Sequence, residues 1–75
     1  MRTIDRTETG KLIRDSIKLA EKKQNKVALN IGCHPGTIQK MCIGCGMEGV
    51  ERFYRLADEL GVYPEDLIVW EEDDG

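Results

Sequence analysis

A short break between two brief helical segments most constrains the fold of this chain. Residues 24–31 (QNKVALNI) and 35–41 (PGTIQKM) each place apolar residues at helical spacing, and only Gly32, Cys33 and His34 lie between them. Glycine commonly ends a helix in the left-handed conformation, and proline is favoured at the first position of the next helix. Two short helices joined by a glycine-containing turn form the helix-turn-helix pattern. The sequence therefore predicts a helix-turn-helix near its centre.

Three further helices are predicted around this pair. The first covers residues 7–23, and Asp5 with Glu8 is a plausible capping pair at its start. Another covers residues 48–60, and a short last helix begins at Pro64. Aromatic residues make up only 5% of the chain and β-branched residues do not alternate, so no strand is predicted. The predicted fold class is therefore all-α, with five helices.

The apolar residues of these segments recur at helical spacing and define a candidate core. The residues expected to face that core are Leu12, Ile13, Ile17, Leu19, Ala20, Val27, Ala28, Ile31, Ile38, Met41, Val50, Phe53, Tyr54, Leu56, Ala57, Leu60, Leu67 and Ile68. Seventy-five residues are enough for one such core. We expect residues 1–70 to form a single domain and the acidic residues 71–75 to form a frayed tail.

The charges are divided unevenly along the chain. Residues 1–40 carry nine Lys or Arg and four Asp or Glu, a net +5, whereas residues 41–75 carry two and ten, a net −8. The basic half suits a phosphate-bearing partner, although a dipolar surface without a partner explains the same numbers. No apolar run approaches the ~20 residues of a membrane span, and the first residues lack the apolar core of a secretory signal. We therefore expect a cytoplasmic protein with no membrane partner.

Three cysteines and one histidine suggest a metal site, but their spacing argues against one. Cys33, His34, Cys42 and Cys45 would supply the four ligands of a structural zinc ion. If residues 35–42 are helical, Cys33 and Cys42 lie about 13 Å apart along the helix axis, at about 1.5 Å per residue. Two sulfurs on one zinc ion lie within ~4 Å of each other. We therefore expect no metal and no cofactor, with Cys42 acting as a small apolar core residue.

The cysteines and His34 could also have a redox or a catalytic role. A redox disulfide between Cys42 and Cys45 is sterically possible and stays open, although reduced thiols are the usual state in a cytoplasmic chain. His34 has no companion serine, second histidine or suitably spaced carboxylate, so a role as a helix cap is simpler than catalysis. We expect no catalytic residues, no enzymatic activity and no small-molecule substrate.

The whole pattern resembles the lambda-repressor/Cro-like (XRE-type) helix-turn-helix family, over about residues 11–68 and without a gap. Gln24 matches the glutamine that opens the family's second helix, and Val27-Ala28 match its Leu-Ala pair. Gly32 matches the turn glycine, and Ile38 matches the buried residue of the recognition helix. Gly44 and the closing "LADELGV" also match. The resemblance implies a five-helix domain that binds double-stranded DNA, such as a phage- or mobile-element-like repressor.

The same resemblance implies a set of DNA contacts, with the third helix in the major groove and the second helix across the backbone. The residues expected to contact DNA are Gln24, Asn25, Lys26, His34, Gly36, Thr37, Gln39 and Lys40. Lys22 and Lys23 join Lys26 in a lysine cluster beside them. Pro35 and Gly36 stand where the family often has long polar side chains that read bases.

A single module of this size usually needs a second copy, so we expect a homodimer. The residues expected to form its interface are Ile68, Val69 and Trp70, although Trp70 could instead cover the core of the monomer. The loss of base-reading side chains leaves a second interpretation open. In that interpretation the chain is a protein-interaction module, antitoxin-like or adaptor-like, on the same fold.

Overall fold

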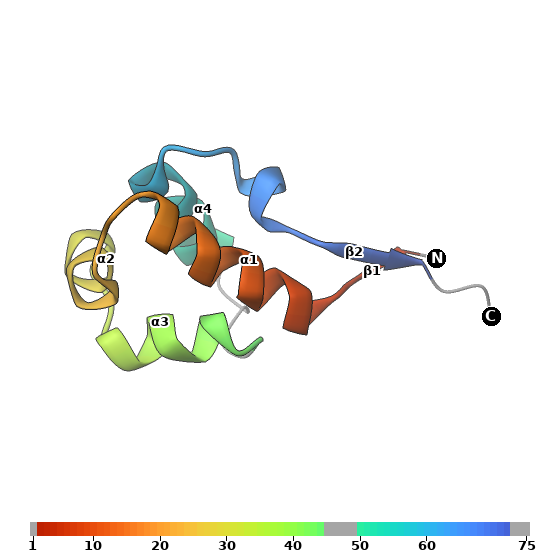
Figure 1. Ribbon diagram of the computed structural model, residues 1–75, viewed down its shortest axis with the longest axis horizontal. Coiled ribbons are helices and arrows are strands. Elements are labelled where there is room, and N and C mark those ends of the chain that lie inside the picture. Colours follow the sequence, from red (N-terminus) through yellow and green to blue (C-terminus); the bar gives the residue numbers. More distant parts are fainter. Residues whose placement is uncertain (1, 45–49, 73–75) are drawn as a thin grey trace.

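The computed structural model describes residues 2–44 and 50–72, which form a helical body with a small two-stranded ribbon (Figure 1). The elements, in chain order, are β1 (Arg2–Ile4), α1 (Arg6–Leu19), α2 (Gln24–Ile31), α3 (Pro35–Cys42), α4 (Val50–Leu60), the 3₁₀ helix η1 (Pro64–Leu67) and β2 (Trp70–Glu72). The molecule measures 41 × 20 × 18 Å, because the ribbon projects from the helices at the end opposite α2. No helix in the described ranges is long and apolar enough to cross a bilayer.

The ends of the helices follow the local signals, with one exception. The carboxylate of Asp5 caps α1 by accepting a hydrogen bond of 3.0 Å from the backbone N–H of Glu8, as predicted. The predicted extension of this helix to residue 23 is wrong, because α1 ends at Leu19. Glu21 adopts a φ of 56°, a left-handed conformation that a helix does not continue through. The predicted helix 48–60 is observed from Val50, and residues 48–49 lie outside the described ranges.

The core lies where α1, α2, α3, α4 and η1 meet. Its buried residues are Ile13, Ile17, Val27, Ala28, Ile31, Ile38, Met41, Cys42, Phe53, Leu56, Ala57 and Leu67. The apolar periodicity predicted all of these residues except Cys42. The burial of Cys42 was predicted separately, from its position on the inner side of the third helix. Leu19 and Tyr54, also predicted to face the core, are 85% and 58% exposed. Tyr54 does not face the core, because the preceding residue Phe53 occupies the inward-facing position of that helical turn.

Helices α1 and α3 approach each other very closely at Gly10. A Cβ atom on Gly10 would lie 2.6 Å from the carbonyl oxygen of Cys42 and 2.8 Å from the backbone nitrogen of Gly44. Backbone atoms cannot move aside as a flexible side chain can, so only glycine fits there without a shift. Gly10 therefore sets how near the C-terminal end of α3 comes to α1.

The predicted all-α fold with five helices is confirmed in part: the described chain is mostly helical, but both of its ends differ from the prediction, so the count of five helices is not confirmed. The fifth helix is a single 3₁₀ turn, and residues 2–4 pair antiparallel with residues 70–72. The partners in this ribbon are Arg2 with Glu72, Thr3 with Glu71 and Ile4 with Trp70. Glu71 and Glu72, assigned above to a frayed tail, lie in β2. Strands of three residues carry too little alternation to be read from the sequence.

The buried hydroxyl of Thr9 ties the ribbon to α1. Its Oγ1 accepts a hydrogen bond of 2.9 Å from the N–H of Val69 and lies 3.4 Å from the Val69 carbonyl oxygen, to which it donates. The N–H of Asp5 also donates to that carbonyl, at 2.8 Å. The base of the ribbon is thereby fixed to the helical body.

Candidate nucleic-acid interface

The turn between α2 and α3 has the geometry that its sequence predicted. Gly32 has φ 76° and ψ 35°, in the left-handed region, and the N–H of Cys33 donates to the carbonyl of Ala28 at 2.9 Å. His34 then caps α3, since its Nδ1 accepts a hydrogen bond of 3.0 Å from the N–H of Gly36. That bond needs an unprotonated Nδ1, so the neutral ring carries its proton on Nε2. The exposed edge of His34 is thus a hydrogen-bond donor.

Side chains on the inner faces of the two helices lock α3 onto α2. Ala28, Val27, Ile38 and Met41 have no exposed surface. Ala28, which was expected to be small because α2 and α3 cross beside it, is fully buried. Because the inner face of α3 is fully packed, its outer face is presented on a rigid support.

The outer face of α3 carries most of the predicted base-contacting residues. Gln39 and Lys40 are exposed, and Gly36 and Thr37 are half-buried at the start of the helix. Ile43 follows one turn after them and is 68% exposed. Ile43 was not among the predicted contact residues, although the helical repeat from Gly36 through Gln39 and Lys40 leads to it. An exposed isoleucine beside this stripe can contact a thymine methyl group.

The N-terminal end of α2 is open toward solvent. Lys23 is its N-cap residue and makes no side-chain capping bond, and no acidic residue lies in the first turn. Asn25 and Lys26 are exposed there, and Gln24 is half-buried. Free backbone N–H groups and the helix dipole make such an end suitable for a phosphate group.

The described residues from Lys22 to Gly44 build a surface that contains no carboxylate of its own. From residue 22 through residue 47 the sequence has no Asp or Glu, and it has four lysines. In the described part of the chain, three of those lysines (Lys23, Lys26 and Lys40) have no ion-pair partner within 4 Å. The segment therefore offers uncompensated positive charge together with amide and hydroxyl groups.

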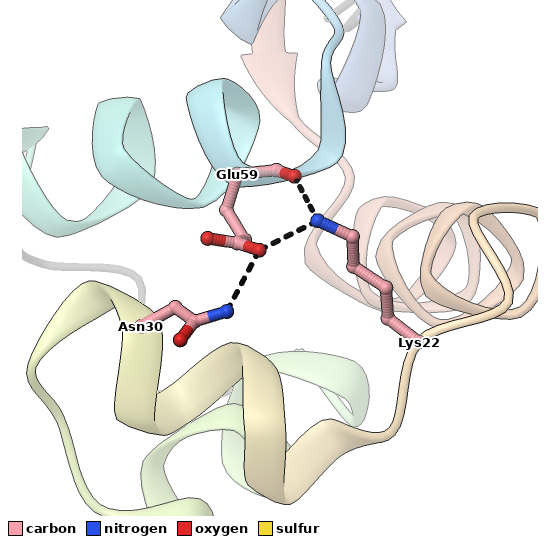
Figure 2. Close-up of polar contacts among 3 residues, drawn as sticks. All are labelled: Lys22, Asn30 and Glu59. Atoms are coloured by element: carbon pink, nitrogen blue, oxygen red, sulfur yellow. Dashed lines mark hydrogen bonds and ion pairs between the residues drawn. The ribbon is translucent and has the colours of Figure 1, made fainter.

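Lys22, predicted to belong to the lysine cluster, is the exception, because its side chain points toward Glu59 on α4 (Figure 2). Its Nζ donates to the carbonyl oxygen of Glu59 at 2.8 Å and to Oε1 of the same residue at 2.6 Å. Asn30 donates to that Oε1 from α2 at 3.0 Å. The hydrogen bonds from Lys22 and Asn30 lower the pKa of the Glu59 carboxyl below its ordinary value of 4.5. These three residues fasten α2 to α4.

A comparison with solved structures identifies this arrangement of helices. The chain is similar to the restriction-modification controller protein C.AhdI from Aeromonas hydrophila, with a TM-score of 0.78 and 19% sequence identity. The likeness covers 84% of this chain and 96% of the controller protein. The chain therefore shares the helix-turn-helix fold of that controller protein. No protein-family model and no curated protein matches the sequence.

The helix-turn-helix also decides how two of the cysteines are placed. Cys33 lies in the turn before α3 and Cys42 ends that helix, so the intervening helix on which the argument against zinc depends is present. Both are free thiols, and burial raises the pKa of the Cys42 thiol, which disfavours the reactive thiolate. In residues 2–44 and 50–72, no cluster of three or more His, Cys, Asp or Glu side chains is placed to hold a metal ion. Cys45 lies outside the described ranges.

The residues predicted for a dimer interface have different surroundings in the helix-turn-helix domain. Ile68 is half-buried and packs against the core, and the backbone of Val69 is held by Thr9. Trp70 is 46% exposed and does not cover the core. The guanidinium of Arg2 lies 4.8 Å from the centre of its ring, in cation–π contact.

Proposed function

We propose that this protein is a DNA-binding transcriptional regulator that places α3 in the major groove of double-stranded DNA. The observation that carries the proposal is the surface of residues 23–44, which has lysines but no carboxylate in a chain of net charge −3. A polyanion is attracted to such a surface and repelled by the acidic remainder, so the charge pattern orients the protein on DNA.

The exposed side chains of α3 supply groups that can read bases. Lys40 can donate to O6 or N7 of guanine, and Gln39 can pair with N6 and N7 of adenine. Thr37 can contact a thymine methyl group or a phosphate. His34 would donate from Nε2, because its Nδ1 is occupied by the cap of α3. Pro35 and Gly36 bring the helix backbone close to DNA but carry no reading group.

The start of α2 supplies contacts that position the protein rather than select a sequence. Gln24, Asn25 and Lys26 lie beside the free N–H groups of this helix end, where a DNA phosphate can bind. Such contacts add affinity on every sequence. Two copies of the protein would then span two half-sites about one DNA turn apart, as a homodimer.

The likeness to a restriction-modification controller protein supports a regulatory role for the chain. A repressor of the phage- or mobile-element-like kind is the role we favour, in the cytoplasm and without a membrane or small-molecule partner. No side chain in the proposed interface is arranged for catalysis, and the chemistry it offers is recognition.

Salt-dependent binding to random duplex DNA tests this proposal. We expect binding at low ionic strength that weakens as salt is added, because each neutralised phosphate releases a counterion. Lys40→Ala should reduce the slope of log affinity against log salt by about one. Lys11→Ala, on α1 and paired with Glu8, is the matched control and should leave the slope unchanged. Absence of salt-dependent binding would exclude a DNA-binding role. If binding is observed, selection of bound duplexes from a random pool would identify the operator.

A second candidate is a protein-interaction module, and one surface favours it. Tyr54, Tyr63, Asp58 and Glu65 line an open groove of about 550 Å³ between α4 and η1. Exposed aromatic rings beside carboxylates suit a basic peptide. If DNA binding is absent, a titration of an arginine-containing peptide against the protein and against Tyr63→Ala would test this alternative.

A further inference from the structure

The ribbon formed by β1 and β2 leaves an uncovered strand edge on each side. Every residue of both strands is exposed, and in the described chain the sheet has only these two strands. Ile4 and Trp70 are register partners and are 44% and 46% exposed. An isolated two-stranded ribbon is marginally stable, and free strand edges invite pairing with another strand.

The hydrogen bonds at the base of the ribbon reveal which backbone groups point outward. The N–H of Asp5 donates to the carbonyl of Val69, so this pair stands at a hydrogen-bonded position of the ladder, although the N–H of Val69 donates to Thr9 instead of Asp5. Pairs alternate along an antiparallel ladder, which makes Thr3 with Glu71 the next hydrogen-bonded pair. The N–H and C=O groups of Arg2 and Ile4 must therefore point away from β2, toward solvent.

We propose that β1 pairs antiparallel with β1 of a second copy of this chain, around a two-fold axis at Thr3. Arg2 of each copy then lies opposite Ile4 of the other, and both residues use the groups that point outward. Each such pair exchanges two hydrogen bonds, so the contact contains four. Thr3 faces its own counterpart as a non-hydrogen-bonded pair, a position in which threonines stabilise a sheet. The product is a single continuous sheet shared by the two copies, with the strand order β2-β1-β1-β2.

The charges of the two strands favour this edge over the other. Pairing of β2 with itself around Glu71 would place that acid opposite its own counterpart, next to Glu72 and the acidic residues that follow. Like charges directly opposite each other destabilise a sheet. Pairing through β1 instead leaves the acidic strands at the two outer edges, where charge prevents further strands from adding. The contact is small, so we expect a dimer that dissociates on dilution.

Cysteine cross-linking tests the position of the two-fold axis. A non-hydrogen-bonded antiparallel pair places its Cα atoms about 4.5 Å apart, within the range that a disulfide spans. Under mild oxidation, Thr3→Cys should form much more covalent dimer than the wild-type protein does. The amount formed by the wild type measures the contribution of the native cysteines. Glu71→Cys, its neighbour on the same face of the ribbon, should not. Cross-linking through residue 71 but not through residue 3 would overturn the proposal.

Proline substitution tests the hydrogen bonds of each edge separately, in the absence of DNA. Ile4→Pro removes an N–H that points away from β2, so the ribbon can persist while the dimer dissociation constant rises at least about tenfold. Ile4→Ala keeps that N–H and controls for the lost side chain. Glu72→Pro makes the same change at the outer edge of β2 and should leave the dimer intact. Circular dichroism checks the helices, and sedimentation measures the mass.

The outcomes that contradict the proposal are equally specific. Equal dissociation constants for Ile4→Pro and Ile4→Ala would mean that the outward N–H is not used. Loss of the dimer in Glu72→Pro, or a mass that grows beyond two copies, would assign the contact to β2 or to head-to-tail pairing. Because no DNA is present, these results are independent of whether the protein binds an operator.

Discussion

Helices α2 and α3 carry two lysines and no carboxylate, whereas residues 50–67, which contain α4 and η1, carry five carboxylates and two arginines. The two regions pack on the same core and differ in how their polar side chains are used. In α4, Glu51 pairs with Arg55 at 2.6 Å and Glu59 binds Lys22 and Asn30. On the outer face of α3, Gln39 and Lys40 make no side-chain hydrogen bond to any residue of the described ranges.

The difference teaches that carboxylates bound within the acidic region leave the lysines of the proposed interface unpaired. A carboxylate within reach of Lys40 or Lys26 would neutralise it and repel a phosphate. Glu51 and Glu59 of α4 bind cations other than Lys26 and Lys40, so they do not neutralise these two lysines. Lys22 is informative because it lies in the basic segment of the sequence but belongs structurally to the acidic region. The basic and acidic regions are therefore surfaces in space rather than halves of the sequence.

The largest effect is expected from a substitution in the core on which both regions pack. Ile38→Ala deletes a side chain with no exposed surface between the helices and should lower the free energy of unfolding by about 2–5 kcal/mol. Gln39→Ala changes the next residue of the same helix, on the exposed side, and should stay within about 0.5 kcal/mol. Urea denaturation of both variants measures the difference. Equal losses would mean that α3 is not packed as the structure shows.

A smaller loss is expected from Gly10→Ala, about 1–3 kcal/mol of the free energy of unfolding. Alanine normally stabilises a helix relative to glycine, so a loss here can come only from the backbone of Cys42 and Gly44. Gly36→Ala is the matched control in α3, where the added methyl group would meet only the His34 side chain, at 3.1 Å. Thermal denaturation compares the two. A stabilised Gly10→Ala protein would contradict the close approach of α1 and α3.

Local signals in the sequence were sufficient for the centre of this fold. The limits of α2, the left-handed Gly32 and the proline that opens α3 each depend on residues within one or two turns. The fold was also predicted, because many such signals agreed with one arrangement of helices. Exposure of Gln39 and Lys40 followed from the same periodicity, so this part of the candidate site was accessible from the sequence.

Features that depend on distant residues were not accessible. The ribbon joins residues 2–4 to residues 70–72, and no local pattern records that the two ends of the chain meet. Lys22 was assigned to the lysine cluster because Lys23 and Lys26 follow it in the sequence, but its partner Glu59 lies 37 residues away. Glu21 interrupts α1 although its side chain suits a helix, since the turn toward α2 requires its positive φ.

The proposed interface separates positioning contacts from reading contacts, and two substitutions should behave differently. Lys26→Ala, at the start of α2, should weaken binding to every duplex by a similar factor and reduce the salt slope by about one. Gln39→Ala, on α3, should lose about 1–3 kcal/mol of discrimination at one base pair while binding to random DNA changes little. Competition assays with a selected duplex and its single-base variants measure both. A uniform effect of Gln39→Ala would remove it from base reading.

The smallest expected effect is a pH dependence at the link between the two regions. Lys22 and Asn30 favour the ionised form of Glu59, so its pKa is lower in the folded protein than in the unfolded chain. The stabilisation is therefore complete above the ordinary value of 4.5 and is lost as the pH falls through the lowered folded value. Unfolding curves between about pH 7 and about pH 3 should show wild type and Glu59→Gln converging toward the acid end. Asp58→Asn removes the same charge one residue earlier and controls for net charge. If its curve follows that of Glu59→Gln, the effect belongs to net charge, and the bonds from Lys22 and Asn30 contribute nothing measurable.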